Sequence, residues 1–250
     1  MKMYPPQLIS RSIPYHHAIF EAAVQTASHE LRTPLTAIAA FSDILSHNRP
    51  GNLNERQMTH VQAIRRSASS LSALVDDLLD VSRADGGQLT LERTPFDFQS
   101  LLQEFSSTAQ TVTSKKHQRL KIDNFNESVW VIGDQARISQ VLNNLISNAS
   151  KYSPDETDIT LTAALHSGRV EVAVVDEGIG VSPHNLDNVF TPFFRAENIE
   201  TQRETGTGLG LTVVKALVEL HGGQVEIESE PGRGTSVNFW IPGVTEQPAS

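Results

Sequence analysis

The chain of 250 residues contains no cysteine. This absence excludes disulfide bonds and metal sites built from thiolates. No apolar run approaches the roughly 20 residues that a membrane-spanning helix needs, and the N-terminus lacks the apolar core of a signal peptide. Basic residues are also scarce: 20 Lys and Arg stand against 29 Asp and Glu, for a net charge of −9. Because no dense basic patch is present, we expect no nucleic-acid partner.

Hydrophobic residues make up 38% of the chain, enough for one globular core plus a helical domain, and no internal repeat is visible. Residues 1–17 are polar and interrupted by proline, and the run Ala-Asp-Gly-Gly at residues 84–87 breaks a helical pattern. These breaks predict four parts: an N-terminal segment or linker at 1–17, a helical hairpin at 18–84, a mixed domain at 88–243 and a tail at 244–250.

The first helical pattern carries a histidine, a carboxylate and a hydroxyl within residues 28–35. His29 and Thr33 are four residues apart and share the outward face of the predicted helix, and Glu30 lies on its flank. Pro34 removes one backbone donor, so we expect a bend there. Taken alone, His29 also fits an ordinary surface histidine. The apolar residues that define the helix recur at three-and-four spacing: Leu31, Leu35, Ile38, Phe41 and Leu45.

A second helical pattern follows the turn cluster at residues 49–52 and runs to about residue 81. Two helices joined by a short turn form an antiparallel hairpin with little core of its own. We therefore expect two copies to pair into a dimeric four-helix bundle, the alternative being a helix pair packed on the next domain. The apolar positions of this second pattern are Leu53, Val61, Ile64, Ala68, Leu71, Val75 and Leu78.

From residue 89 the pattern becomes mixed, which predicts an α+β domain with helices packed on one face of a sheet. We expect helices at residues 98–114, 136–152 and 209–220, the second of them capped by Asp134 and the third stopped at residues 221–223. Strands are expected at residues 89–92, 120–122, 129–132, 159–165, 170–175, 225–229 and 235–241.

Three polar segments of this domain suggest a nucleotide site. Asn144 and Asn148 share a helix face, and an amide oxygen suits Mg²⁺ that already carries phosphate, although both could be surface residues. Asp176 ends an apolar strand, where its carboxylate could accept a hydrogen bond from an exocyclic amine, and the following glycines also fit a plain turn. Residues 206–211 (GTGLGL) open a helix, and free amides there favour phosphate. The glycine spacing matches neither a Walker nor a Rossmann loop.

Five segments resemble, in order, the conserved boxes of sensor histidine kinases: residues 29–35 (HELRTPL), 144–152 (NLISNASKY), 176–180 (DEGIG), 190–195 (FTPFFR) and 206–211 (GTGLGL). The resemblance covers roughly residues 18–242. It implies a dimerisation and histidine-phosphotransfer hairpin followed by an α/β-sandwich (Bergerat-type) ATP-binding domain of the gyrase, Hsp90 and MutL superfamily. The polar run at residues 196–205 would be a lid over ATP.

The same resemblance implies roles for individual residues, with ATP and Mg²⁺ as cofactors. His29 would accept the phosphoryl group, Glu30 would be a general base or orient the imidazole, and Thr33 would position water for a receiver phosphatase activity. Asn148 would bind Mg²⁺, Asn144 would act nearby, and Asp176 would read the adenine amino group. The remaining nucleotide contacts would come from Lys151, Tyr152, Gly178, Gly180, Gly206, Thr207, Gly208, Leu209 and Gly210, with Arg195 and Arg203 as weaker candidates.

The implied partners are a response-regulator receiver domain, a second copy of the chain, and an upstream sensor domain or sensing partner. Since residues 1–17 show no sensor module, the chain is either the excised core of a longer sensor or senses through a partner. We expect a cytoplasmic location, as a free protein or as part of a membrane-bound sensor. Two rival functions stay open: a clamp-type ATPase without phosphotransfer, and a scaffold that binds a receiver domain but not ATP.

Overall fold

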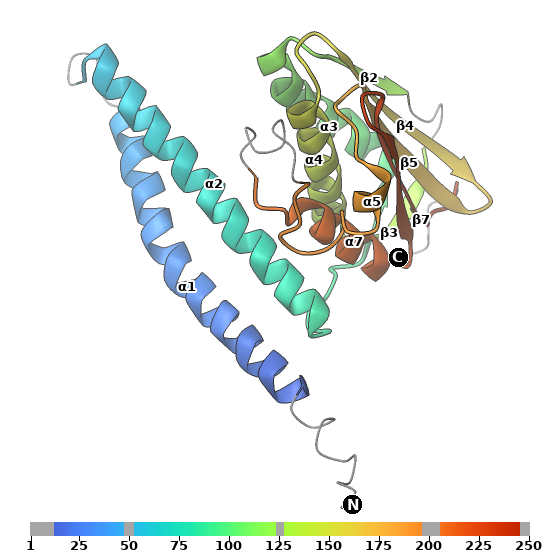
Figure 1. The fold of residues 1–250 in the computed structure, drawn as a ribbon, viewed down its shortest axis with the longest axis horizontal. Coiled ribbons are helices and arrows are strands. Elements are labelled where there is room, and N and C mark those ends of the chain that lie inside the picture. Colours follow the sequence, from blue (N-terminus) through green and yellow to red (C-terminus); the bar gives the residue numbers. More distant parts are fainter. Residues whose placement is uncertain (1–12, 48–52, 124–127, 197–205, 246–250) are drawn as a thin grey trace, which may run out of the picture. The chain divides into compact units, whose positions relative to one another are not determined.

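The computed structural model describes residues 13–47, 53–123, 128–196 and 206–245, without the side chains of residues 13–27, 29 and 30. The chain divides into two compact units, residues 1–89 and residues 90–250. The first is a helical hairpin and the second a mixed sheet covered by helices (Figure 1). No helix in the described ranges combines the length and the apolar character needed to cross a bilayer.

The first unit consists of α1 (Ile13–Ser46) and α2 (Glu55–Asp85). The turn predicted at residues 49–52 lies outside the described residues. Shortly after it, Asn54 caps α2. The Asn54 side chain accepts from the Gln57 N–H at 2.9 Å, and the Gln57 side chain accepts from the Asn54 N–H at 2.9 Å. This capping box satisfies two of the donors that a helix start leaves unpaired. At the other end α2 stops at Asp85, four residues beyond the predicted end, and Gly86 is its C-cap.

A narrow core joins the two helices: Leu35 of α1 packs with Ala68, Val75 and Leu79 of α2. Of the five apolar positions predicted on the first helix, only Leu35 is buried within this hairpin. α1 continues through Pro34 without interruption, and the predicted bend there stays a prediction. Several large apolar side chains of the hairpin are exposed, namely Leu31, Ile38, Phe41, Ile44, Leu45, Ile64 and Leu71.

The second unit is built on a five-stranded sheet with the order β2-β4-β5-β7-β6. Its strands are β2 (Arg119–Asp123), β4 (Asp158–His166), β5 (Arg169–Asp176), β6 (Gln224–Glu230) and β7 (Gly234–Pro242). The β2–β4 pair is parallel, and all the other neighbours are antiparallel.

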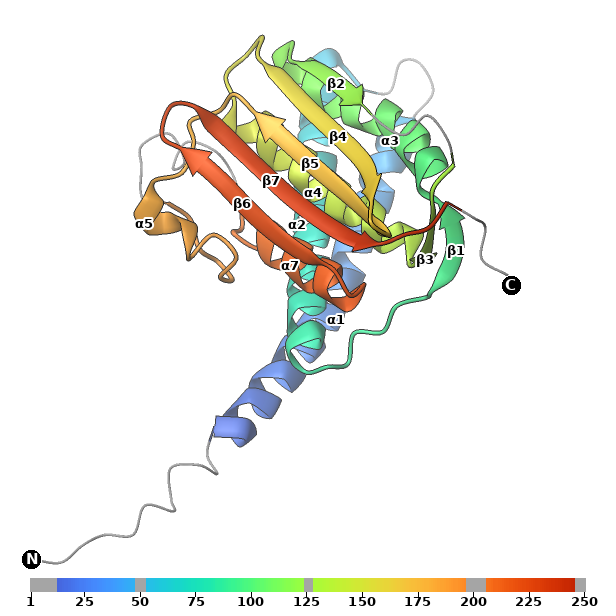
Figure 2. The same cartoon turned by 90° about the vertical axis from the view of Figure 1, so that its right-hand side faces the viewer.

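The helices α3 (Phe98–Thr113), α4 (Gln135–Tyr152) and α7 (Gly210–Leu220) cover one face of this sheet, as predicted (Figure 2). Alternate residues of β5, starting at Val170, are buried toward the helices because successive side chains of a strand point to opposite faces. Asp134 caps α4 as expected, since its side chain accepts from the Arg137 N–H at 3.1 Å. The described part of the unit also contains two short helices that the pattern did not predict, η1 (Ser114–Lys116) and α5 (Pro183–Leu186).

The strand predicted at residues 89–92 is wrong. The first strand of the second unit is β1 (Thr94–Asp97), which pairs with β3 (Trp130–Gly133) in a separate two-stranded sheet. The backbone donors at both ends of this segment are used elsewhere: the Leu89 N–H donates to the Arg83 carbonyl at 3.1 Å, and the Glu92 N–H donates to Asp134 Oδ2 at 3.1 Å. The alternation of apolar residues in this short segment therefore does not reflect a strand.

Candidate functional site: a pocket at the end of α4

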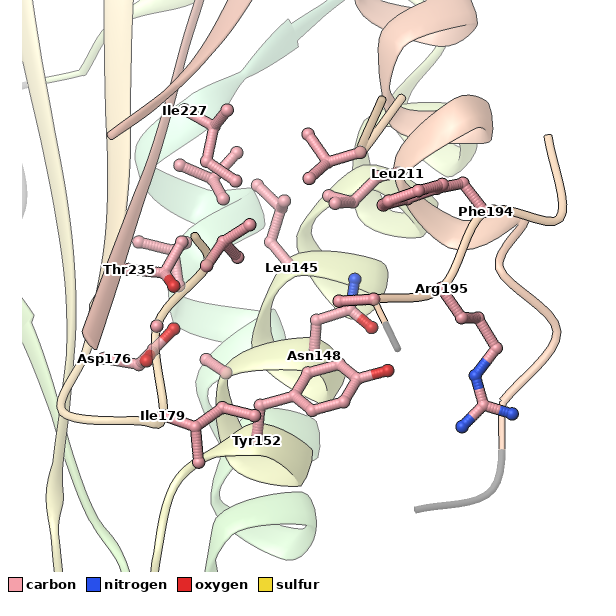
Figure 3. Close-up of a pocket in the computed structure, with 17 residues that line it drawn as sticks. Leu145, Asn148, Tyr152, Asp176, Ile179, Phe194, Arg195, Leu211, Ile227 and Thr235 are labelled. Atoms are coloured by element: carbon pink, nitrogen blue, oxygen red, sulfur yellow. The ribbon is translucent and has the colours of Figure 1, made fainter. Parts of the chain in front are cut away.

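A pocket in the second unit lies between α4 and the ends of the central strands (Figure 3). In Figure 3, Asp176 and Thr235 lie together on the strand side, Asn148 and Tyr152 come from the helix, and Arg195 stands at the edge. Its lining is mainly apolar, with a few polar groups, as is typical of a small-molecule site. The lining includes Leu145, Asn148, Tyr152, Val174, Asp176, Ile179, Gly180, Phe194, Arg195, Leu211, Ile227, Thr235 and Val237.

Asp176 is the buried charged group of this pocket, with 8% of its surface exposed. Burial raises the pKa of its carboxyl to about 6, and the Gly178 N–H, which donates to Oδ1 at 2.8 Å, opposes that rise. At neutral pH the group is therefore a carboxylate, and its burial makes it a strong acceptor for a donor that enters the pocket.

The turn after Asp176 is fixed on two sides by close backbone contacts. The Ile179 N–H donates to the Tyr152 carbonyl at 3.1 Å, and a Cβ on Gly178 would lie 2.6 Å from that same oxygen. Gly180 has a φ of +67°, and a Cβ there would lie 2.0 Å from the Glu230 carbonyl oxygen. Both positions therefore require glycine, because any side chain would push the turn away from α4 or from the β6–β7 hairpin.

Two asparagine side chains on the polar face of α4 lie next to the start of α7. Asn144 and Asn148 are half-buried one turn apart, and Asn144 Nδ2 donates to the Gly210 carbonyl at 3.4 Å. A Cβ on Gly210 would lie 3.7 Å from Asn148 Nδ2, so the glycine lets the backbone lie close above both amides. Lys151 Nζ, which donates to the Tyr152 hydroxyl at 2.9 Å, carries a positive charge at the end of the same face.

The glycine segment 206–210 leads into α7 beside these residues. Leu209 is fully buried and anchors the segment, and its N–H donates to Thr207 Oγ1 at 3.2 Å. A Cβ on Gly206 would lie 2.2 Å from Lys151 Nζ, so the segment runs directly past that ammonium group. Arg195 Nη1 donates to the Gly206 carbonyl at 3.1 Å. Arg203 and nearly all of the predicted lid lie outside the described residues.

One pocket residue was not predicted as a site residue. Thr235 pairs with Asp176 across β5 and β7, and its N–H reaches the Asp176 carboxyl, while the residue itself lines the pocket. The chain pattern predicted the strand that holds Thr235, but it could not place that strand beside β5. Only the strand order, which puts β7 beside β5, would have identified Thr235 as a pocket residue.

The acceptor segment belongs to the first unit. His29, Glu30 and Thr33 all lie on α1, and the Thr33 side chain is exposed, as predicted. The side chains of His29 and Glu30 lie outside the described part of the structure. Of the predicted nucleotide residues, the pocket of the second unit is lined by Asn148, Tyr152, Asp176, Gly180 and Arg195. The predicted acceptor segment lies on the hairpin.

Comparison with known proteins agrees with this division. Residues 21–87 match the family described as His Kinase A (phospho-acceptor) domain, and residues 133–245 match the family described as Histidine kinase-, DNA gyrase B-, and HSP90-like ATPase. The chain is 36% identical over 215 residues to the Histidine protein kinase DivJ of Caulobacter vibrioides, covering 86% of this chain and 36% of that protein.

Two further proteins bear on the site. The chain is 32% identical over 222 residues to the Autoinducer 2 sensor kinase/phosphatase LuxQ of Vibrio parahaemolyticus, covering 86% of this chain and 25% of that protein. The crystal structure of full-length ShkA in complex with AMPPNP matches with a TM-score of 0.73 at 28% identity, covering 91% of this chain and 47% of that one. The chain therefore spans 36% or less of these two curated relatives.

Proposed function

We propose, since this chain belongs to the sensor histidine kinases, that it is a core which phosphorylates its own His29 with ATP and passes the phosphoryl group to an aspartate of a response-regulator receiver domain. The observation that carries the proposal is the pocket at the end of α4, which is lined by the buried Asp176 carboxylate and the Asn148 amide, in a chain that also holds the acceptor segment. The proposed parts are the hairpin at residues 18–84 and the catalytic domain at residues 88–243.

The apolar part of the pocket binds the adenine ring. Asp176 accepts a hydrogen bond from the exocyclic amine, and the Gly178 to Gly180 turn brings backbone against the ring edge. Leu145 and Ile227 provide the apolar surface that removes the ring from water. Thr235 lies beside the carboxylate, where its hydroxyl adds a second polar contact on the same side of the base.

The phosphates extend along α4 toward the start of α7. Lys151 and Tyr152 contact phosphate or sugar, and the backbone of Gly206, Thr207, Gly208, Leu209 and Gly210 supplies amides near the helix start. Two arginines are candidates for contact with the γ-phosphate. Arg195 lies beside Gly206, and Arg203 lies outside the described residues.

Mg²⁺ fits the donor set of this site. The described residues contain no cluster of three or more His, Asp or Glu that would hold a metal by themselves. An ion that shares the phosphate oxygens of ATP needs few protein ligands, and the side chains of Asn148 and Asn144 offer neutral hard oxygens one turn apart. When bound there, the ion would neutralise charge on the phosphates during transfer.

Transfer requires an imidazole nitrogen of His29 to attack the γ-phosphorus in line, as the bond to the β–γ bridging oxygen breaks and ADP leaves. Glu30 acts as general base or orients the ring so that the attacking nitrogen is unprotonated. The product is a phosphohistidine on α1. The receiver aspartate then takes the phosphoryl group, and His29 returns to its starting state.

The test is incubation of the full chain with γ-labelled ATP and Mg²⁺, followed by acid and alkali treatment of the labelled protein. We expect a label that is lost in acid and stable in alkali, because the P–N bond of phosphohistidine hydrolyses when the ring nitrogen is protonated. Nucleotide binding without label would favour the clamp-type ATPase. Failure to bind nucleotide at all would leave the scaffold.

Thr33 gives the chain a proposed second activity, dephosphorylation of the receiver domain. Its exposed side chain shares the α1 face predicted for His29, from which a hydroxyl can position water at a receiver docked there. Thr33→Ala should lower the rate of receiver dephosphorylation about tenfold or more, and autophosphorylation should be unchanged. Thr36→Ala, an exposed threonine on the same helix, is the control. Equal rates for wild type and Thr33→Ala would show that Thr33 has no such role.

The hairpin is proposed to form a homodimer through the apolar side chains that it exposes. Ile64 and Leu71 are seven residues apart on α2 and 49% and 42% exposed, which is a large apolar surface to leave in water. Ile64→Glu should weaken the dimer about 100-fold, because a carboxylate would be buried between the hairpins. Sedimentation measures the dissociation constant. Ala63→Glu, at an exposed neighbouring position, adds the same charge and should leave the dimer intact.

The proposed setting follows from the family. An upstream sensor domain or a sensing partner would set the activity of this core, and the core itself would work in the cytoplasm, as a free protein or as part of a membrane-bound sensor. The relatives are several times longer than the part that this chain matches, so their additional regions are where such input would arise.

A further inference from the structure

The C-terminal end of α4 lies inside the proposed nucleotide site, and its carbonyl groups are held by other parts of the second unit. The last four carbonyls of a helix have no partner within the helix. Here the Ala149 carbonyl accepts from the Ser153 N–H at 3.1 Å, and the Tyr152 carbonyl accepts from the Ile179 N–H at 3.1 Å. The carbonyls of Ser150 and Lys151 accept from two side chains that precede β2.

Gln118 contacts three carbonyls at this helix end and just beyond it. Its Nε2 donates to the carbonyls of Ser150, Ser153 and Pro154 at 3.0, 3.2 and 3.0 Å, so two amide hydrogens are shared among three acceptors. Its Oε1 accepts from Ser150 Oγ at 2.7 Å, which fixes the orientation of the amide. The residue is 6% exposed and does not line the pocket. Lys116 adds a cation, with Nζ 2.8 Å from the Lys151 carbonyl.

The segment that Gln118 holds is the one on which the base-binding turn rests. The Tyr152 carbonyl lies between the Ser150 and Ser153 carbonyls, and it receives the Ile179 N–H. Gly178 packs so closely against the same oxygen that a Cβ there would lie 2.6 Å from it. A shift of this helix end therefore displaces the turn that carries Asp176. Asn148 lies earlier in α4, where the helix's own hydrogen bonds hold the backbone.

We propose that Gln118 is a positioning residue for recognition of the adenine base: it fixes residues 150–154, the end of α4 and the two residues after it, and through the Tyr152 carbonyl it fixes the turn from Asp176 to Gly180. The inference rests on the proposed function, because it assumes that the pocket binds an adenine nucleotide. It assigns the base end of the site to a support that Asn148 and residues 206–210 do not share. Loss of Gln118 therefore weakens contacts to the base more than contacts to the phosphates, of which only those from Lys151 and Tyr152 lie on the segment that Gln118 holds.

The test compares two ligands on the full chain carrying Gln118→Met, which keeps the side-chain length and removes every hydrogen bond of the side chain. ADP probes base and phosphate contacts together, whereas tripolyphosphate with Mg²⁺ probes phosphate contacts alone. Calorimetric titration should show ADP binding weakened about tenfold and tripolyphosphate binding weakened by clearly less. Gln110→Met, at an exposed position of α3, is the matched control and should bind both ligands as the wild type does.

The outcomes separate this inference from the proposed function. Unchanged ADP affinity in folded Gln118→Met, or equal weakening of both ligands, would overturn the role of Gln118. A wild-type chain that binds no ADP would overturn the proposed function and the inference with it. If Gln118→Met does not fold, Ser150→Ala removes only the bond that orients the amide. That variant should bind ADP about threefold more weakly and should lose less affinity for tripolyphosphate, and normal ADP binding would overturn the inference.

Discussion

Replacing His29 with glutamine should abolish acid-labile labelling by γ-labelled ATP. An amide nitrogen is not a nucleophile, because its lone pair is delocalised into the carbonyl group, so no phosphoramidate forms at this position. The substitution keeps a polar side chain of similar reach on α1, and it lies in the unit at residues 1–89, whereas the nucleotide pocket lies in the unit at residues 90–250. Affinity for ATP should therefore equal that of the wild type while the label falls to background.

The matched control for this loss is His60→Gln, the same change at an exposed position of α2. Labelling of the control should match the wild type, since any general effect of losing a histidine from the hairpin would appear in both variants. Persistent labelling of His29→Gln with the same acid lability would mean that another histidine accepts the phosphoryl group. The proposed acceptor would then be wrong although the kinase activity stood.

Glu30→Gln provides a graded comparison at the neighbouring position. If the carboxylate withdraws a proton from the imidazole or orients it, the variant should label about 100-fold more slowly while the label remains on His29 and ATP affinity stays normal. Single-turnover labelling at saturating ATP measures this rate separately from binding. An equal loss of rate and nucleotide affinity would show that Glu30 acts through folding of the hairpin and not through the chemical step.

Much of the fold could be predicted because the signals are local. The apolar stripe of α4 and the cap at Asp134 lie within consecutive turns, and the alternation along β5 marks a strand with one buried face. The strand order could not be predicted, because pairing between β5 and β7 joins residues about 60 positions apart. Thr235 was missed as a pocket residue for this reason: its place beside Asp176 depends on that pairing.

The error at residues 89–92 has a different physical origin. Alternating Leu89 and Leu91 satisfy a strand pattern, yet a strand also needs a partner for its backbone, and here the donors bond to Arg83 and Asp134 instead. The support of α4 by Gln118 was invisible for a related reason. A single buried glutamine between a turn and a strand carries no periodic signal. Its role as a support can be recognised only when the positions of the carbonyls that it contacts are known.

Replacing Asp176 with asparagine should weaken ATP binding about 100-fold, because the charge-assisted hydrogen bond to the exocyclic amine is lost and the amide offers a weaker acceptor. The loss should depend on that amine. Purine riboside triphosphate has no amino group at the same ring position, so the wild type and the variant should bind it with equal, weak affinity. Asp187→Asn, at an exposed position outside the pocket lining, is the control and should bind ATP normally.

Without nucleotide, the same substitution should leave the stability of the protein unchanged or raise it. Burial raises the pKa of Asp176 to about 6, so the folded state holds a proton on this group more tightly than the unfolded chain does, and stability from this group falls as pH rises from about 4 to about 6. At pH 7 the unliganded protein carries a buried carboxylate that asparagine removes. We therefore expect the nucleotide-free variant to melt at the same temperature as the wild type or higher at pH 7, and to lack the wild-type decrease between pH 4 and 6.

These two results together separate recognition from folding. Weak ATP binding by a variant that is at least as stable as the wild type does not come from a loss of folding, so the cause lies at the carboxylate itself. ATP binding by the wild type should also weaken below about pH 6, where Asp176 becomes protonated and loses its charge. If ATP and purine riboside triphosphate lost affinity equally in Asp176→Asn, the carboxylate would support the shape of the turn through Gly178 and would not read the base.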